Sequence, residues 1–499
     1  MQKLSTLAIA AALIAAQAEA ETVKLTLLGV GDVYNFEEED GRGGFARLNA
    51  VAKAERAANP NTLYLFNGDM LSPSLASGFD KGQNTIDFTN LVPFDLAVPG
   101  NHEFDFGPEN FMEKMKASKY PWAAINITNG DGSAIEGLGG VMVKEVGGLK
   151  VALIPVAQDT SPEVSSTGSL KFLPTVEGGI AAAEKAREDG ADLVVGVVQT
   201  NMENDRALMA SGAFDVILSG DDHSYATAYD GRTAYVETSV DGQFLTPIDL
   251  MVEVEVKDDG KRDISWVPNF RFIDTAAVTP DPESVAMADA LRATMDKTLD
   301  VEIGTLEAPL DSRRNVVRAE EATMGNLIAD AMRAATGANI AIMNGGGIRG
   351  DTTYDAGRKL TRRDILTELP FGNTTVVTEL PGSQVLLALE NGVSQAEKGA
   401  GRFPQVSGLS YAFDVTAAAG SRVSEVMVGG AALEADKLYK VAVNDYILGG
   451  GDGYDALGGG RVLTDGPTGQ LVANDVMAHV EKLGTVNVAV EGRIKKLGQ

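Results

Sequence analysis

Five apolar stretches in the first half of the chain each end in polar residues, and this pattern constrains the fold more than any other feature. Each stretch has the length and composition of a buried β-strand. Segments with helical spacing alternate with the stretches, which indicates a layered α/β or α+β sandwich. Because ligands gather at the carboxyl ends of strands in such folds, the polar residues are candidate metal ligands. The stretches cover residues 23–30, 62–66, 96–99, 193–198 and 215–218, and the residues that follow them include Asp32, Asp69, Asn101, Asn201 and Asp221.

The segment Gly-Asn-His-Glu-Phe-Asp at residues 100–105 combines three kinds of chemistry. Asn101 offers an amide oxygen to a metal. His102 can donate a proton to a leaving oxygen, and Asp105 can hold the imidazole in one tautomer. The chain has only 3 histidines, so a histidine between an amide and a carboxylate indicates function more than chance. We therefore predict that His102 and Asp105 act as a catalytic pair.

The second half of the chain contains glycine-rich segments of the kind that bind phosphates or nucleotides. A strand at 339–343 leads into Asn344-Gly-Gly-Gly-Ile-Arg349. Consecutive glycines let backbone amides approach a ligand closely, and an arginine can hold a carboxylate or phosphate with two parallel N–H groups. Just before this strand, the apolar spacing over 322–336 predicts a core helix that ends at Gly337. Further segments of interest are Leu-Pro-Phe-Gly at 369–372, Asn-Asp-Tyr at 444–446 and Gly-Gly-Gly-Asp-Gly-Tyr at 449–454.

These segments together resemble a known family. Asp32, Gly68-Asp69, Gly100-Asn101-His102 and Gly220-Asp221-Asp222-His223 are similar to the sequence blocks of calcineurin-like metallophosphoesterases. With the C-terminal segments, nearly the whole chain after residue 20 resembles the 5'-nucleotidase family, which includes bacterial periplasmic UDP-sugar hydrolases. The resemblance implies an α/β (α+β) fold class: a four-layer metallophosphoesterase sandwich over 21–275, a linker helix within 276–300, and a smaller α/β nucleotide-binding domain over 301–499. It also implies an active site in the cleft between the two domains.

The resemblance assigns roles to residues of the second half. Phe371 and Tyr446 match the two aromatic side chains that stack on the faces of a nucleotide base, and the family usually has Phe at the position of Tyr446. A tyrosine ring stacks as well as a phenylalanine ring. The other matching positions are Asp452 for the ribose hydroxyls, Asn344 for the base, and Arg318 and Arg349 for the phosphate and ribose.

The metal-binding half departs from the family pattern. Tyr34, Asn201 and Asp221 stand where the family usually has histidine, while Asp32, Asp69, Asn101 and His223 remain as candidate ligands, with Asp221 adding a carboxylate. The resemblance implies two divalent metal ions with Asp69 between them. Because the donor set is rich in oxygen, we expect Mn, Mg or Ca to be favoured over Zn. Tyr34 is either a phenolate ligand suited to a ferric ion or a filler at a lost ligand position.

Two functions from different classes fit this sequence. The first is a metal-dependent phosphohydrolase that releases phosphate from nucleotides or related phosphate esters, for nucleotide catabolism or phosphate scavenging. The second is a nucleotide-binding pseudoenzyme with a degenerate metal site. The intact pair of His102 and Asp105 favours the enzyme, whereas the three substituted histidines favour the pseudoenzyme. We expect the enzyme.

The N-terminus and the charge predict where the protein works. Lys3, the apolar run over 7–16 and Ala18-Glu19-Ala20 predict a signal peptide that is cleaved after residue 20, and the run is too short to span a bilayer. The formal net charge of -28 argues against partners such as nucleic acid or an anionic membrane. We expect a soluble protein of the periplasm, or a secreted one.

Overall fold

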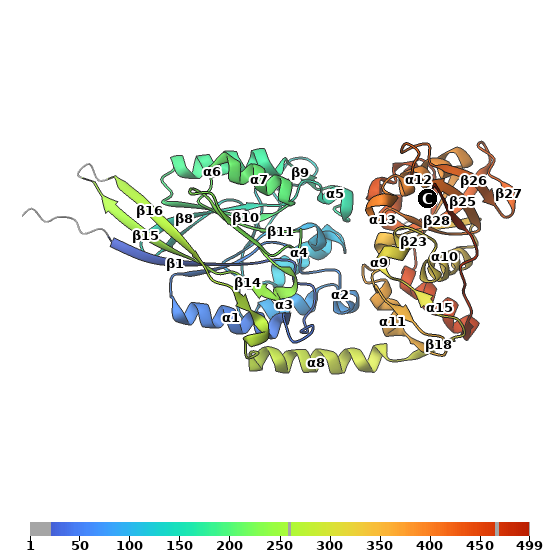
Figure 1. The fold of residues 1–499 in the computed structure, drawn as a ribbon, viewed down its shortest axis with the longest axis horizontal. Coiled ribbons are helices and arrows are strands. Elements are labelled where there is room, and N and C mark those ends of the chain that lie inside the picture. The colour runs from blue at the N-terminus through green and yellow to red at the C-terminus, as the bar shows by residue number, and fades with distance from the viewer. Residues whose placement is uncertain (1–20, 258–260, 465–468, 499) are drawn as a thin grey trace, which may run out of the picture.

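The computed structural model describes residues 21–257, 261–464 and 469–498, and the predicted signal peptide lies outside these residues. The chain forms two α/β halves side by side, joined by one long helix (Figure 1).

Two sheets form the centre of the first half. The first sheet has the order β16 (Arg262–Phe270), β15 (Ile248–Val256), β1 (Glu21–Val30), β2 (Thr62–Phe66), β3 (Leu96–Ala97), β4 (Trp122–Ala123) and β6 (Leu138–Gly139). The second has the order β12 (Ala226–Tyr229), β13 (Ala234–Glu237), β11 (Val216–Gly220), β10 (Leu193–Gln199), β8 (Leu149–Val156) and β7 (Met142–Val146).

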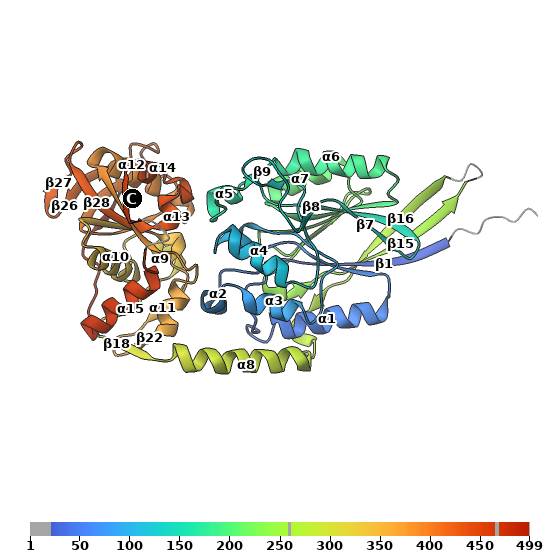
Figure 2. The same cartoon turned by 180° about the vertical axis from the view of Figure 1, so that it is seen from behind.

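The two sheets pack face to face, because alternate residues of their strands are apolar and point inward. Leu25 and Leu65 of the first sheet and Leu153, Val195 and Leu218 of the second belong to one fully buried core. Helices α1 (Gly44–Ala58), α3 (Gln83–Thr89) and α4 (Pro108–Ala117) cover the outer face of the first sheet, and α6 (Thr175–Glu188) and α7 (Met202–Ser211) cover that of the second (Figures 1 and 2). The four-layer sandwich expected from the resemblance is confirmed.

The carboxyl ends of the central strands meet at one edge of this sandwich. β1, β2 and β3 are parallel, and so are β10 and β11. The chain leaves three of these strands through residues with positive φ, namely Asp32 at 55°, Asp69 at 68° and Asp221 at 103°. These sharp turns direct the polar side chains of both sheets toward each other instead of along the strands.

Helix α8 (Pro282–Leu299) connects the two halves and runs along one side of the molecule (Figure 1). Its N-terminus is well defined, because proline occupies the first turn and the Asp281 side chain accepts a hydrogen bond from the Ser284 N–H. Near its C-terminus, Asp296 and Asp300 both pair with Arg363 of α11 (Arg362–Glu368) in the second half.

The second half is built around a five-stranded sheet with the order β24 (Pro404–Ser407), β20 (Ile340–Asn344), β28 (Leu438–Asn444), β23 (Thr375–Pro381) and β29 (Arg461–Thr464). Helix α10 (Thr323–Thr336) packs on it through Met324, Leu327 and Ile328, which are fully buried. The helix ends at Gly337 in the left-handed conformation, as the sequence predicts. Asn344 ends β20, and a turn of three glycines at 345–347 follows it.

Candidate active site

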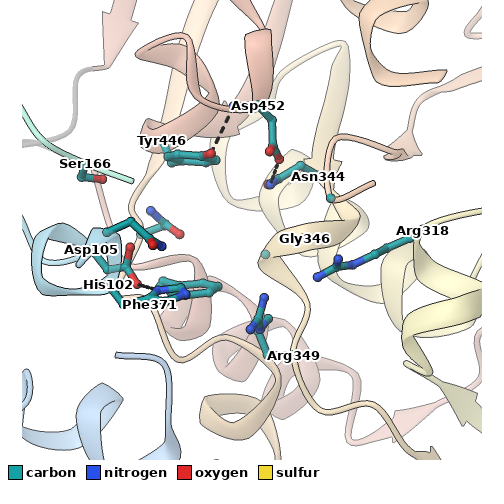
Figure 3. Close-up of a pocket in the computed structure, with 14 residues that line it drawn as sticks. His102, Asp105, Ser166, Arg318, Asn344, Gly346, Arg349, Phe371, Tyr446 and Asp452 are labelled. Carbon is teal, nitrogen blue, oxygen red and sulfur yellow. Dashed lines mark hydrogen bonds and ion pairs between the residues drawn. The ribbon is translucent and has the colours of Figure 1, made fainter. Parts of the chain in front are cut away.

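A cavity of about 240 Å³ lies between the two halves and is lined by both (Figure 3). The catalytic pair predicted from the sequence and the residues predicted to bind substrate therefore share one cavity. The first half contributes Asn101, His102, Asp105 and Ser166, and the second contributes Arg318, Asn344, Arg349, Phe371, Asn373, Tyr446 and Asp452, with glycines between them.

His102 and Asp105 lie on one short helical turn, and their side chains are paired. Nδ1 of His102 is 2.6 Å from Oδ2 of Asp105. The other oxygen of Asp105 accepts a hydrogen bond of 2.8 Å from the hydroxyl of Ser165, sixty residues further along the chain. Because Nδ1 is bound to the carboxylate, the opposite ring nitrogen of His102 is left to exchange a proton with a ligand.

Glu103 holds the turn that carries this pair. Its fully buried carboxylate accepts hydrogen bonds from the backbone N–H groups of Gly100, Asp69, Met70 and Leu71. The backbone N–H of His102 in turn donates to Oδ1 of Asp69, over 2.8 Å. The loop after β2 and the loop after β3 are thus tied together by one side chain.

Asp32 and Asp69 are buried carboxylates that face each other across the strand ends. Oδ1 of Asp32 is 3.4 Å, and Oδ2 of Asp69 is 2.7 Å, from Nε2 of Gln199, which ends β10. Oδ2 of Asp32 accepts a hydrogen bond from the Asp221 backbone N–H. Burial raises the pKa of both carboxyl groups well above the ordinary value, and neighbouring carboxylates add to the shift. A nearby positive charge would relieve this cost.

Tyr34 lies between two histidines. Its ring centroid is 5.5 Å from that of His102 and 5.5 Å from that of His223. Its hydroxyl is 3.0 Å from Nε2 of His223 and 3.3 Å from Oδ1 of Asp32, and those two atoms are 3.7 Å apart. Ligands of one cation stand roughly 3 Å from one another, since each is about 2.0–2.4 Å from the ion. The spacing of these three atoms is therefore compatible with a shared cation.

The two remaining substituted positions differ from each other. Asp221 lies within the cluster, where burial and the neighbouring Asp222 raise its pKa to about 6. Asn201 does not join the cluster, because its side-chain oxygen caps α7 and accepts from the N–H groups of Glu203 and Asn204. Of the two, only Asp221 remains a candidate ligand.

Amide oxygens without donors surround the carboxylates. Within the described residues, Oδ1 of Asn67, Oε1 of Gln158 and Oε1 of Gln199 are buried and have no hydrogen-bond partner. The Gln158 amide nitrogen contacts Asp221 at 3.4 Å, so this side chain borders the cluster as Gln199 does. An excess of oxygen acceptors over donors suits a hard divalent cation, and the residues present fit such an ion. No three carboxylate or imidazole groups of the described residues converge closely enough to hold one alone, so amide or phenol oxygens must complete its ligands.

The aromatic pair lies on the second-half side of the cavity. Phe371 is stacked parallel to His102 with ring centroids 6.4 Å apart, and the Arg349 guanidinium lies 5.3 Å from its centroid. The Tyr446 hydroxyl accepts a hydrogen bond of 3.1 Å from the Asp452 backbone N–H (Figure 3). The tyrosine that replaces the usual phenylalanine thus holds the loop that carries the predicted ribose ligand.

Asn344 points to Asp452 within the cavity. Its amide nitrogen donates to Oδ2 of Asp452 over 2.8 Å, and its oxygen accepts from the Asn444 amide. This arrangement orients the carboxylate of Asp452, which also has a side-chain hydrogen bond with Tyr446. Asn344 therefore acts on the site at least in part through Asp452.

Arginines supply the positive charge of the site. Arg318 and Arg349 line the cavity, where desolvation lowers the pKa of both guanidinium groups. The pKa of Arg318 falls to about 10, and the positive charges of Arg314 and Arg349 contribute to that shift. Nε of Arg318 is buried without a partner, and within the described part of the chain none of these three guanidinium groups forms an ion pair with a carboxylate. Such a cluster is arranged to receive an anion.

Several residues of the site were not predicted. Gln199 directly follows the apolar stretch 193–198, but the family pattern pointed to Asn201, two residues later; Ser165 lies in a loop far from Asp105 in the sequence. Arg314 begins a short helix, α9 (Arg314–Val317), one turn before Arg318, and this i, i+4 spacing was the available signal. The position of Glu103 beside His102 was a further signal, because a buried turn needs an acceptor for its N–H groups.

Comparisons with known proteins agree with this geometry. Residues 25–225 match the calcineurin-like phosphoesterase family, and residues 302–459 match the C-terminal domain of 5'-nucleotidases. The chain is 28% identical to the trifunctional nucleotide phosphoesterase protein YfkN of Bacillus subtilis (strain 168), over 95% of the chain but 35% of that longer protein. It is 25% identical to the human 5'-nucleotidase, over 95% of the chain and 91% of the relative.

Solved structures share the same two-part architecture. The 5'-nucleotidase precursor from Thermus thermophilus matches with a TM-score of 0.74 and 28% identity, over 96% of this chain and 100% of that one. A putative 5'-nucleotidase from Staphylococcus aureus, solved in complex with alpha-ketoglutarate, matches with a TM-score of 0.76 and 20% identity, over 95% and 100% of the two chains, and shows the shared fold. The family resemblance stated from the sequence motifs is confirmed.

Proposed function

We propose that this chain, which belongs to the 5'-nucleotidase family and is a nucleotide phosphohydrolase, cleaves phosphate from nucleotides in the cavity between its two halves. The observation that carries this proposal is that His102 and Asp105 line the same cavity as Phe371, Tyr446 and the arginines. The hydrolases among the relatives support the enzyme, and nothing among them favours the pseudoenzyme.

Substrate binding would be divided among three groups of residues. The base stacks between Phe371 and Tyr446, the ribose hydroxyls bind the carboxylate of Asp452, and the phosphate binds near Arg318 and Arg349. Arg318 is buried, and neither arginine forms an ion pair within the described residues, so a phosphate gives them the anionic partner that they otherwise lack.

The chemical step rests on His102. Its free ring nitrogen protonates the leaving oxygen, and Asp105 keeps the ring oriented and stabilises its protonated form. The family uses divalent metal ions, generally two. Asp32, Asp69, Asn101, Asp221 and His223 would hold them here, and bound cations supply Lewis acidity toward the phosphoryl group. We propose Mn, Mg or Ca rather than Zn, because oxygen atoms outnumber nitrogen atoms in this set.

The place of action is proposed from the sequence. The predicted signal peptide at residues 1–20 would deliver the protein to the periplasm or outside the cell. In the part of the chain that the structure describes, no helix has the length and apolar character that crossing a membrane requires.

Phosphate release from a panel of nucleotides and nucleotide sugars tests the function. Metal-stripped protein is assayed with Mn, Mg, Ca or Zn added singly. We expect release from nucleoside monophosphates with at least one of the first three ions, and a loss of about 10²–10⁴-fold for His102→Ala without loss of bound metal. His479→Ala is the matched control, because His479 lies on α15 (Val472–Leu483), outside the cavity. Equal rates for the two variants would refute the role of His102, and binding of nucleotides without hydrolysis under any cation would establish the pseudoenzyme.

A further inference from the structure

The side chain of Gln199 lies in the middle of the carboxylate cluster. The residue ends β10, is fully buried, and directs its amide between Asp69 and Asp32, with Nε2 at 2.7 and 3.4 Å from their oxygens. An apolar residue would be the ordinary choice at the end of a buried strand. A glutamine at this depth needs partners for both ends of its amide, because an unpaired buried polar group is costly.

One end of this amide lacks a partner. Oε1 of Gln199 is buried and accepts no hydrogen bond from any described residue. It lies beside Gly220, where a Cβ atom would be 2.6 Å from Oε1, 2.7 Å from Oδ2 of Asp32 and 3.1 Å from the carbonyl oxygen of Asn67. Three oxygen atoms, from Gln199, Asp32 and Asn67, thus surround one point beside Gly220.

A half-turn of the planar amide exchanges its oxygen and nitrogen. The NH₂ group would then lie on the side of Gly220, while the oxygen would face Asp69 and Oδ1 of Asp32. In the absence of a positive charge such an arrangement would bring three acceptors together. With a cation among them, every polar atom of Gln199 has a partner.

Space for the amide is provided by two glycines. A Cβ atom at Gly68 would be 2.8 Å from Cδ and Oε1 of Gln199, and one at Gly220 would be 2.6 Å from Oε1. Side chains at either position would displace the amide from the cluster. The loops after β2 and β11 are therefore shaped around Gln199.

The residue at the family's usual metal-ligand position after this strand already has another role. Asn201 stands where the family usually has a histidine, but its side-chain oxygen caps α7. No three carboxylate or imidazole groups of the described residues can hold a cation without help. A further oxygen ligand is needed, and β10 brings one to the cluster two residues before Asn201.

We propose that Gln199 is a metal ligand in this chain, and that its amide oxygen joins Asp32 and Asp69 in binding a divalent cation. It would replace the histidine that the family usually has at the position of Asn201. This assignment rests on the proposed function, since it concerns the same metal site. A neutral amide oxygen of this kind favours Mn, Mg or Ca over Zn.

Binding of Mn²⁺ to metal-stripped protein tests the assignment without reference to activity. The free ion is followed by electron paramagnetic resonance during titration of the parent, Gln199→Leu, Gln199→Glu and Asn201→Ser. Gln199→Leu keeps the volume and removes the oxygen, and we expect it to weaken binding by at least about tenfold. Gln199→Glu keeps an oxygen and adds charge, so it should bind at least as tightly as the parent. Asn201→Ser is the control, because serine also caps helices, and its affinity should stay within about twofold of the parent.

The outcomes separate the ligand assignment from the function. Melting temperatures without metal identify any variant that fails to fold, and Gln199→Glu then tests the oxygen independently. Unchanged or tighter Mn²⁺ binding by Gln199→Leu would overturn the proposal. Tighter binding would show that the amide of Gln199 keeps cations away from the carboxylates. If the parent hydrolyses nucleotides and Gln199→Leu binds Mn²⁺ as tightly as the parent does, the ligand assignment is refuted and the proposed function stands. A parent that binds no Mn²⁺ would overturn the assignment, and the phosphate-release assay would still decide the function.

Discussion

Replacement of Ser165 by alanine should slow catalysis without weakening substrate binding. The Ser165 hydroxyl donates to Oδ1 of Asp105 over 2.8 Å, and the other oxygen of Asp105 holds His102 at 2.6 Å. The Asp105 side chain is only 7% exposed, so water cannot fully replace the lost donor. A hydrogen bond to a charged acceptor is worth about 1.5–3 kcal/mol. This sets an upper limit of about 10²-fold on the loss of kcat, because Ser165 acts through Asp105.

Steady-state kinetics with a nucleoside monophosphate would measure this effect. We expect Ser165→Ala to lower kcat by about 5- to 100-fold with KM nearly unchanged, and Ser165→Thr to restore most of the rate because it keeps the hydroxyl. Ser166→Ala is the matched control: Ser166 lines the cavity, so its loss should change KM rather than kcat. A kcat for Ser165→Ala within about twofold of the parent, or a threonine variant as slow as the alanine variant, would refute the positioning role.

Three further predictions concern other parts of the molecule. Replacing Phe371 and Tyr446 together by alanine should weaken nucleotide binding by about 1–3 kcal/mol for each ring while inorganic phosphate binds as before; unchanged nucleotide affinity by calorimetry would place the base elsewhere. Arg318→Met should weaken inhibition by phosphate by at least about tenfold yet raise the melting temperature, because it removes a buried guanidinium whose Nε lacks a partner; a lower melting temperature would contradict this reasoning. Burial raises the pKa of Glu237, which accepts from the Tyr235 hydroxyl, to about 9 from 4.5. Between these values the folded state keeps a proton that the unfolded chain releases, so the free energy of unfolding should fall as pH rises, by at most about 1.4 kcal/mol per pH unit; Glu237→Gln should flatten this slope in urea unfolding of metal-free protein at pH 5–8, and an equal slope would refute the assignment.

Local patterns were sufficient to predict most of the fold. The apolar strands with polar ends, and the helix that stops at Gly337, depend on neighbours in the sequence and on side-chain periodicity, and the structure contains them. The pairing of His102 with Asp105 was also predictable, because three residues separate them on one turn. The motifs after β20 and β28 indicated a nucleotide pocket through their resemblance to those of the 5'-nucleotidase family.

The remaining parts of the site depend on contacts between distant segments. Gln199 is an outlier only when Asp32 and Asp69, from the other sheet, are seen around it. Asn201 matched a substituted ligand position, and its role as the cap of α7 follows from the backbone conformation at the start of that helix. Ser165 could not be linked to Asp105 before the loops were placed in space. In each case the chemistry of a residue is set by neighbours that sequence spacing does not specify.

The buried carboxylate of Glu103 has a consequence for redesign. It anchors the backbone of Asp69 and of Gly100, next to the turn that carries His102, so a proposed cation ligand and the proposed proton donor are fixed by the same side chain. A change on this side of the site would move both at once. Gln199 and Asp221 face the proposed cation site from the second sheet, and the hydrogen bonds of Glu103 among the described residues all go to loops of the first sheet. An engineer who wishes to alter metal preference while keeping the geometry of proton transfer should therefore work from β10 and β11.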